Sequence, residues 1–169
     1  MKIKSFLLYA LITFLTLNAE ARQSQHNPTQ LGDDELKGVI IKLERTECFG
    51  ACPVYSITIH GDGVVDYDGK KFVKETGKRS YKISRENVRE LVEEFYKADY
   101  FSMEKEYLSR KNADGTETQV TDLPATQTSI TIGKKTKSVY NYFGGPDALR
   151  ELEHKIDQIS GVAKYVKKK

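Results

Sequence analysis

Two stretches of alternating apolar and polar residues, each followed by glycine, constrain the fold of this chain more than any other feature. Val54–His60 alternates and leads into Gly61-Asp62-Gly63, and Thr126–Ile132 alternates before Gly133-Lys134. A period of two indicates a strand with one buried face, and glycine permits the positive φ angles of a tight hairpin turn. The sequence therefore predicts two β-hairpins that each need a hydrophobic layer against one face.

Further segments complete the expected sheet. Val39–Arg45 begins apolar and then alternates, Val64–Asp68 returns from the first turn, and Lys135–Phe143 returns from the second. A short segment between two glycines, Lys71–Lys74, is expected to form a fourth strand, with Tyr81–Ile83 extending the pairing beyond it.

Two helices are expected, one after each group of strands. Ser84 is a favourable N-cap for the first helix, Pro146 suits the first position of the second, and Gly161 should end it. Apolar residues recur at the spacing of one buried helical face: Val88, Leu91, Val92 and Phe95, then Leu149, Leu152, Ile156 and Ile159.

The predicted order is β-β-β-β-α-β-β-α. It is typical of an α+β fold in which two helices pack on one face of an antiparallel sheet. A long polar connection, residues 104–122, separates the first helix from the second hairpin, and Lys111–Gly115 within it has turn composition. A connection of this length in a compact domain is either mobile or functional.

The N-terminus has the three parts of a cleavable signal peptide. Lys2 and Lys4 precede an apolar run, Phe6–Leu17, and Ala19-Glu20-Ala21 is an A-x-A cleavage signature. The apolar run is shorter than the roughly 20 residues of a membrane-spanning helix, so no stable membrane anchor is expected after cleavage. Residues 1–21 are therefore predicted to direct export to the periplasm or the cell exterior.

The mature chain is expected to contain one folded domain. Residues 22–37 are polar and predict a flexible leader, residues 38–166 a single α+β domain, and residues 167–169 a basic tail. Without the signal peptide the chain has 25 basic and 23 acidic residues. Because no stripe of Lys and Arg alternates with aromatic residues, nucleic-acid binding is not expected.

Cys48 and Cys52, the two cysteines of the chain, lie in the run Cys-Phe-Gly-Ala-Cys-Pro. In an exported protein, an even number of cysteines favours a disulfide. By the loop-entropy relation, closing so short a loop stabilises the fold by about 2 kcal/mol.

The alternative interpretation is a redox or copper-binding site. The C-x-x-x-C-P run resembles the copper-delivery motif of a thioredoxin-like family of membrane-tethered assembly proteins, and His60 would be the third ligand. In that fold the cysteines precede a helix whose N-terminus stabilises thiolate. Here a strand pattern follows Pro53, so the sequence favours the disulfide and predicts no metal or other cofactor.

Common catalytic motifs are absent from the sequence. It contains no G-x-S-x-G, H-E-x-x-H, P-loop or G-x-G-x-x-G pattern, and its aspartates do not match a calcium-binding loop. Asp122 and Glu106 have no spacing that indicates a hydrolase. A noncatalytic domain is therefore favoured over an enzyme.

A candidate binding patch combines residues from the end of the long connection with an aromatic cluster. Its members are Thr121, Asp122, Tyr140, Tyr142 and Phe143. If the aromatic side chains are exposed, they form a platform for a partner, whereas full burial would place them in the core. The expected partner is a protein or another ligand of the cell envelope.

Four segments together resemble one known family. They are Cys48-Phe-Gly-Ala-Cys-Pro-Val-Tyr, the strand that leads to Gly61-Asp-Gly, Thr121-Asp-Leu-Pro and Tyr142-Phe-Gly-Gly-Pro. Their order and spacing resemble the uncharacterised bacterial family catalogued as domain of unknown function 6438, over roughly Gly38 to Ile159. The resemblance implies one exported domain, and it implies no activity, ligand or catalytic residue.

Overall fold

The computed structural model describes residues 31–167. Its strands are β1 (Ile40–Arg45), β2 (Val54–His60), β3 (Val64–Lys71), β4 (Gly77–Lys82), β5 (Glu106–Tyr107), β6 (Arg110–Lys111), β7 (Glu117–Thr118), β8 (Thr126–Ile132) and β9 (Lys135–Asn141). Its helices are α1 (Asp33–Lys37), α2 (Arg85–Lys97), α3 (Asp147–Ser160) and α4 (Ala163–Val166), with a 3₁₀ turn at Tyr100–Ser102.

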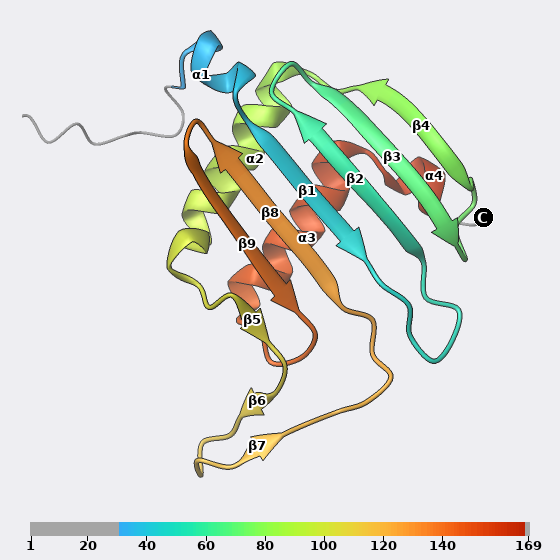
Figure 1. Ribbon diagram of the computed structural model, residues 1–169, viewed down its shortest axis with the longest axis vertical. Coiled ribbons are helices and arrows are strands. Elements are labelled where there is room, and N and C mark those ends of the chain that lie inside the picture. Colours follow the sequence, from blue (N-terminus) through green and yellow to red (C-terminus); the bar gives the residue numbers. More distant parts are fainter. Residues whose placement is uncertain (1–30, 168–169) are drawn as a thin grey trace, which may run out of the picture.

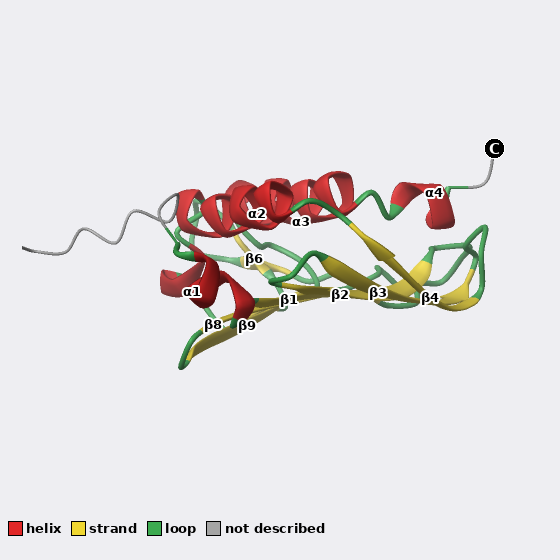
Figure 2. Ribbon diagram, turned by 90° about the horizontal axis from the view of Figure 1, so that it is seen from above, coloured by secondary structure: helices red, strands yellow, loops and turns green. Residues whose placement is uncertain are grey.

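Seven strands form one sheet in the order β4-β3-β2-β1-β8-β9-β5 (Figure 1). Neighbouring strands are antiparallel except for β5, which runs parallel to β9. Helices α2 and α3 lie over one face of this sheet, and no helix of the described chain covers the other (Figure 2). The structure confirms the predicted α+β class with both long helices on one face.

Both predicted hairpins are present. β2 and β3 pair around a turn in which Gly63 has a φ of 86°, and β8 and β9 pair around Gly133, with a φ of 57°. A side chain on Gly63 would also meet the carbonyl of Ile83, since an added Cβ would lie 2.3 Å from that oxygen. The glycine turns thus set the register that puts the apolar set of each strand on the helix-covered face.

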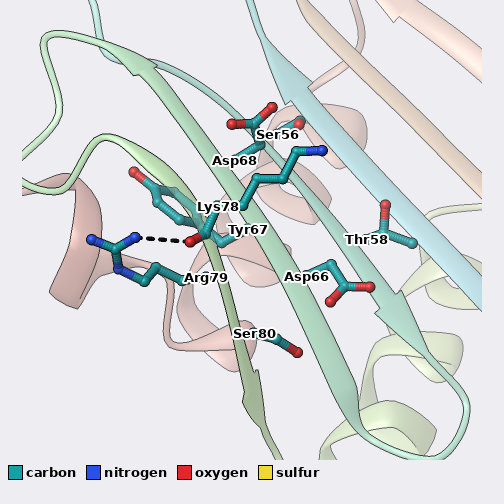
Figure 3. A pocket seen from close by; sticks show the side chains of 8 residues that line it. All are labelled: Ser56, Thr58, Asp66, Tyr67, Asp68, Lys78, Arg79 and Ser80. Carbon is teal, nitrogen blue, oxygen red and sulfur yellow. Dashed lines mark hydrogen bonds between the residues drawn. The ribbon is translucent and has the colours of Figure 1, made fainter.

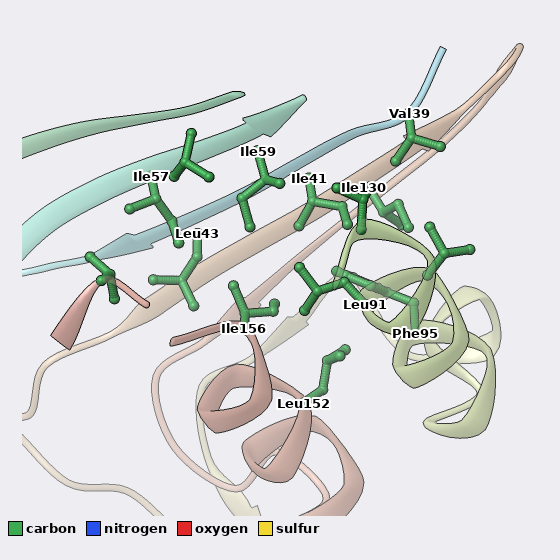
Figure 4. Close-up of a cluster of buried hydrophobic side chains, with 14 of the residues drawn as sticks. Val39, Ile41, Leu43, Ile57, Ile59, Leu91, Phe95, Ile130, Leu152 and Ile156 are labelled. Atoms are coloured by element: carbon green, nitrogen blue, oxygen red, sulfur yellow. The ribbon is translucent and has the colours of Figure 1, made fainter. Parts of the chain in front are cut away.

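The core lies between this face and the two long helices. Ile41, Leu43, Ile57, Ile59 and Ile130 point from the sheet toward Leu91, Phe95, Leu152 and Ile156 of the helices (Figure 4). The four apolar residues expected to be buried on the first helix are all buried in α2. As predicted, Ser84 caps this helix, because its hydroxyl accepts a hydrogen bond from the Asn87 amide. Pro146 is the N-cap of α3 rather than its first residue, and Gly161, with a φ of 69°, ends it.

The fourth strand differs from the prediction. β3 continues to Lys71, and β4 lies at Gly77–Lys82, so most of the expected strand 71–74 belongs to a turn. The Tyr67 hydroxyl donates a hydrogen bond to the Glu75 carbonyl at 2.7 Å, and the Glu75 amide donates to the Tyr165 carbonyl in α4. Since these backbone groups bond to a side chain and to the C-terminal segment, they have no strand partner.

The folded part of the chain begins before Gly38. Helix α1 occupies the end of the expected leader, and Leu31 and Leu36 are both buried in the core. These two leucines attach an otherwise polar segment to the core, and Asp33 of the same segment pairs with Arg89 of α2 at 2.6 Å. The expected signal peptide and residues 22–30 lie outside the described residues, as do Lys168 and Lys169 of the basic tail. No helix within residues 31–167 is long and apolar enough to cross a membrane.

The long connection, residues 104–122, contains three short strands that were not predicted. β5 adds to the edge of the large sheet, and β6 and β7 form a two-stranded arm that projects beyond it (Figure 1). The expected turn is present in this arm, where the Asn112 amide donates a hydrogen bond to the Thr116 carbonyl at 2.8 Å.

Candidate functional site

Three segments that are far apart in the sequence meet at one end of the sheet, which we call the loop end. They are residues 46–53 between β1 and β2, residues 119–125 before β8, and residues 142–146 after β9. Figure 1 shows this end opposite α1. Three of the four family-like segments lie wholly or partly here, whereas Gly61-Asp62-Gly63 lies at the other end of β2.

Hydrogen bonds join the three segments to one another. The Phe49 amide donates to the Asp122 carbonyl at 3.2 Å, and the Thr46 amide donates to the Ala125 carbonyl at 3.0 Å. The Leu123 amide donates to the Tyr142 hydroxyl at 3.3 Å. The loop end is therefore one connected surface rather than three independent loops.

Cys48 and Cys52 form a disulfide in the first of these segments, with their Cα atoms 5.8 Å apart. Phe49 lies inside the closed loop, and 89 % of its surface is exposed. The bridge thus holds an exposed aromatic side chain on a short, constrained loop.

The structure does not assemble the alternative metal site. His60 is at the opposite end of β2, about 20 Å along the strand, and it contacts Asp66 at 3.0 Å. Within residues 31–167, no group of three or more His, Cys, Asp or Glu side chains is placed to hold a metal ion. The segment after Pro53 is a strand, as expected, so the cysteines do not directly precede a helix as they do in the thioredoxin-like fold.

A cleft of about 330 Å³ opens beside the loop end, which we call the loop-end cleft. It lies where β8 and β9 meet the arm and the first turns of α3. Its lining residues are Arg45, Arg110, Pro124, Thr126, Asn141, Tyr142, Phe143, Gly144, Arg150, Glu153 and His154. The lining combines three guanidinium groups with one carboxylate and an aromatic pair.

A polar network around Arg45 forms one wall of the cleft. The guanidinium contacts the Asp157 carboxylate at 2.7 Å and donates to the Thr126 hydroxyl at 3.0 Å. The Tyr55 hydroxyl donates to the other Asp157 oxygen at 2.6 Å. Burial, together with the charge of Asp157, raises the pKa of Tyr55 far above its usual range, so this hydroxyl remains a donor.

Glu153 is a buried carboxylate in the same cleft, with 6 % of its surface exposed. It accepts a hydrogen bond from the Asn141 side chain at 2.8 Å. Burial raises the pKa of Glu153 above its usual value, against the opposing effects of Asn141 and the Arg45 charge. Glu153 is thus a buried acid on a helix whose neighbouring positions 151 and 154 are exposed.

Arg110 comes from β6 and covers the opposite wall. Its guanidinium carbon lies 4.7 Å from the centre of the Phe143 ring, a cation–π distance. Gly144, with a φ of 85°, lets the Ser109 backbone approach closely, since an added Cβ would lie 2.2 Å from the Ser109 carbonyl oxygen. Arg150 bonds to the Gly145 carbonyl and to Asp147.

The structure separates the residues of the expected binding patch. Tyr142 and Phe143 line the loop-end cleft and are partly exposed, whereas Tyr140 lies opposite Gln127 on the open face of the sheet. Thr121 and Asp122 are exposed on the neighbouring loop but do not line the cleft. Binding by this patch stays a prediction.

Sequence reasoning missed the charged residues of the cleft. Arg45, Arg110, Arg150 and Glu153 come from β1, β6 and α3. No motif links them, because their proximity depends on strand order and on the path of the arm. The Gly144-Gly145 pair was a usable signal, since adjacent glycines after a strand often mark a close backbone approach.

A second hollow, of about 400 Å³, lies on the open face over β2, β3 and β4 (Figure 3). Its lining residues are Ser56, Thr58, Asp66, Tyr67, Asp68, Lys78, Arg79 and Ser80. Figure 3 shows Arg79 bonded to the Lys78 backbone, and its guanidinium also pairs with Glu75 at 3.6 Å. This hollow contains charges of both signs from adjacent strands, which is usual for a solvated sheet face.

Comparison with known proteins identifies the family. The model of a domain of unknown function, DUF6438, matches residues 39–160. The chain belongs to the DUF6438 family. The match confirms the resemblance, and it includes every residue that lines the loop-end cleft of this DUF6438 domain. A search of curated proteins found no match.

Proposed function

We propose that this DUF6438 domain is an exported, noncatalytic binding domain whose ligand surface is the loop end. The observation that carries the proposal is the hydrogen bonding that joins three separate segments around one cleft. Loops positioned by a rigid sheet are a common location for binding residues, because the sheet fixes their relative positions.

Exposed apolar side chains support a binding role for this end. Phe49, Leu108 and Leu123 are 89, 51 and 39 % exposed. Phe49 and Leu123 lie on segments of the loop end, and Leu108 lies between β5 and β6. Single exposed apolar residues are ordinary, but a concentration of them at one end is a mark of interaction sites.

The export part of the proposal rests on the N-terminal sequence and on the disulfide. An oxidising compartment would keep Cys48 and Cys52 paired, which agrees with their geometry. Intact-mass measurement of the protein recovered from the periplasm or the medium tests this part. We expect a chain that begins at Arg22 and contains the disulfide, and a chain that begins at Met1 would contradict export.

Site-specific photo-crosslinking in the producing cells tests the binding surface. A photoreactive phenylalanine derivative at Leu123 should give a discrete adduct, because this exposed side chain lies on the loop end. The matched control is the same derivative at Lys78, which is exposed on the open face. Adducts from Lys78 alone, or from neither position, would contradict the proposal.

A further inference from the structure

We infer that the loop-end cleft recognises a carboxylate attached to a small apolar group, and that Arg110 is its principal partner. This inference rests on the proposed function, since it specifies what the loop end binds. The inference depends on which of the three guanidinium groups has a carboxylate partner, on the contacts that position Arg110, and on the volume and lining residues of the cleft.

Arg110 is the guanidinium of the cleft without a carboxylate partner. Arg45 pairs with Asp157 and Arg150 pairs with Asp147, whereas Arg110 has no ion pair anywhere in the described part of the chain. Its guanidinium group lies over the Phe143 ring. A stacked guanidinium keeps its N–H groups free at the edge, where they match the two oxygens of a carboxylate.

The arm holds Arg110 in place before any ligand arrives. The amides of Tyr142 and Phe143 both donate to the Tyr107 carbonyl, at 2.9 and 3.1 Å, at the start of the arm. Because Gly144 has no side chain, the Ser109 backbone packs directly against the Gly144 backbone. Since the donor is already positioned, little conformational entropy would be lost on binding.

The charges of the lining favour a monoanion. Three guanidinium groups face one carboxylate, and this carboxylate, Glu153, is buried on the α3 side. Because Asp157 and Asp147 neutralise Arg45 and Arg150, the unpaired charge of Arg110 is the one that attracts a ligand, and it favours an anion over a cation. When Glu153 is ionised, it repels a second negative charge on the ligand. A carboxylate at Arg110 satisfies both conditions.

The lining and the volume of the loop-end cleft indicate that the carboxylate of the ligand is attached to a small apolar group. Pro124, Tyr142 and Phe143 provide apolar surface beside the guanidinium groups. A volume of about 330 Å³ is near the lower end of small-molecule sites, so the ligand is small or is one end of a longer chain.

Titration of the isotopically labelled protein, followed by NMR, tests the inference with benzoate and its uncharged analogue benzamide. Benzoate should produce saturable shifts of the Arg110 side-chain Nε–H and of the amides of residues 142–144. Benzamide should produce no saturable shift. Arg110→Gln should weaken benzoate binding at least tenfold, and the control Arg79→Gln, on the open-face hollow, should leave it unchanged.

Several results would overturn the inference. They are equal binding of benzamide, unchanged benzoate affinity in Arg110→Gln with an otherwise native spectrum, and tighter binding of phenyl phosphate than of benzoate. If inorganic phosphate saturates the same chemical-shift changes, the conclusion that the ligand contains an apolar group is contradicted. If Leu123 gives a crosslinked adduct while benzoate fails to bind, only the carboxylate inference falls, whereas the absence of any adduct removes the proposed function itself.

Discussion

At the scale of single residues, the loop end depends on partly buried polar side chains that form hydrogen bonds with one another. Arg45 at the end of β1, Tyr55 in β2 and Asp157 in α3 share hydrogen bonds, so one carboxylate holds two strands and a helix together. The side chains of Arg45 and Asp157 are 22 and 24 % exposed. Such a pair is more sensitive to the loss of one member than a surface pair is.

We predict that Asp157→Asn lowers the free energy of unfolding by about 2 kcal/mol, because Arg45 stays largely buried without its counter-charge. Urea denaturation followed by far-UV circular dichroism measures the change. The matched control is Asp147→Asn, since the side chain of Asp147 is 84 % exposed and its pair with Arg150 should contribute below about 0.5 kcal/mol. Equal losses in the two variants would contradict the role of the network.

Glu153 gives a prediction of pH dependence. Its pKa is raised by burial, so the folded protein favours the protonated acid, and the stability from this preference is lost as pH rises through the folded-state pKa. Glu153→Gln cannot ionise, yet its side-chain oxygen can still accept the bond from Asn141.

The variant should therefore melt at a temperature higher by roughly 2–5 °C at neutral pH, and the difference should vanish at about pH 4 and below. Thermal denaturation across this range measures the difference. Glu151→Gln, at an exposed position of the same helix, is the control and should show no such pH-dependent gain. A gain that persists unchanged in acid would contradict the assignment to ionisation.

At the scale of elements, the arm and the segment after β9 define the cleft jointly. β5 attaches the start of the arm to β9, and Gly144 provides the close contact that places Arg110 over Phe143. The long polar connection is thus an ordered element of the structure, with its own hairpin.

We predict that Gly144→Ala displaces the arm and separates Arg110 from Phe143. The new Cβ would clash with the Ser109 carbonyl and would also be strained by the positive φ of this position. Loss of the ring-current shift of the Arg110 side chain in NMR spectra reports the separation. Gly115→Ala is the matched control, because Gly115 has a φ of 83° but no atom within 4 Å of an added Cβ. An unchanged Arg110 signal in Gly144→Ala would contradict the contact.

At the scale of the whole molecule, the folded domain includes Leu31 and α1. Leu36 is 1 % exposed, and its carbonyl lies against Gly61, where an added Cβ would come within 1.6 Å of the carbonyl oxygen. The helix therefore covers the end of the sheet opposite the loop end.

We predict that Leu36→Ala lowers the free energy of unfolding by about 3 kcal/mol, as for other fully buried leucines. Chemical denaturation measures this loss. Asp34→Ala, in the same helix, is the control and should change stability by less than about 0.5 kcal/mol, because the Asp34 side chain is 95 % exposed. A loss below about 1 kcal/mol for Leu36→Ala would place α1 outside the cooperative core.

Sequence reasoning succeeded where the decisive interactions are local. The hairpin at Gly133, the cap at Ser84 and the stop at Gly161 each depend on residues a few positions apart, and all three are present. It failed at 71–74, where the amides of Lys74 and Glu75 donate to the carbonyls of Val166 and Tyr165, because these partners come from the distant C-terminal segment.

The sequence alone determined the α+β class, the two hairpins and the buried face of α2, and it favoured the pairing of Cys48 with Cys52. Each of these features is indicated by a local sequence pattern: the periodicity of apolar residues, the glycines of the turns, or the short spacing of the cysteines. Only the tertiary structure decided that β1 lies between β2 and β8, and hence that Arg45, Arg110 and Glu153 share one cleft. The physical reason is that pairing between strands far apart in the chain depends on how the whole core packs, which no local pattern encodes.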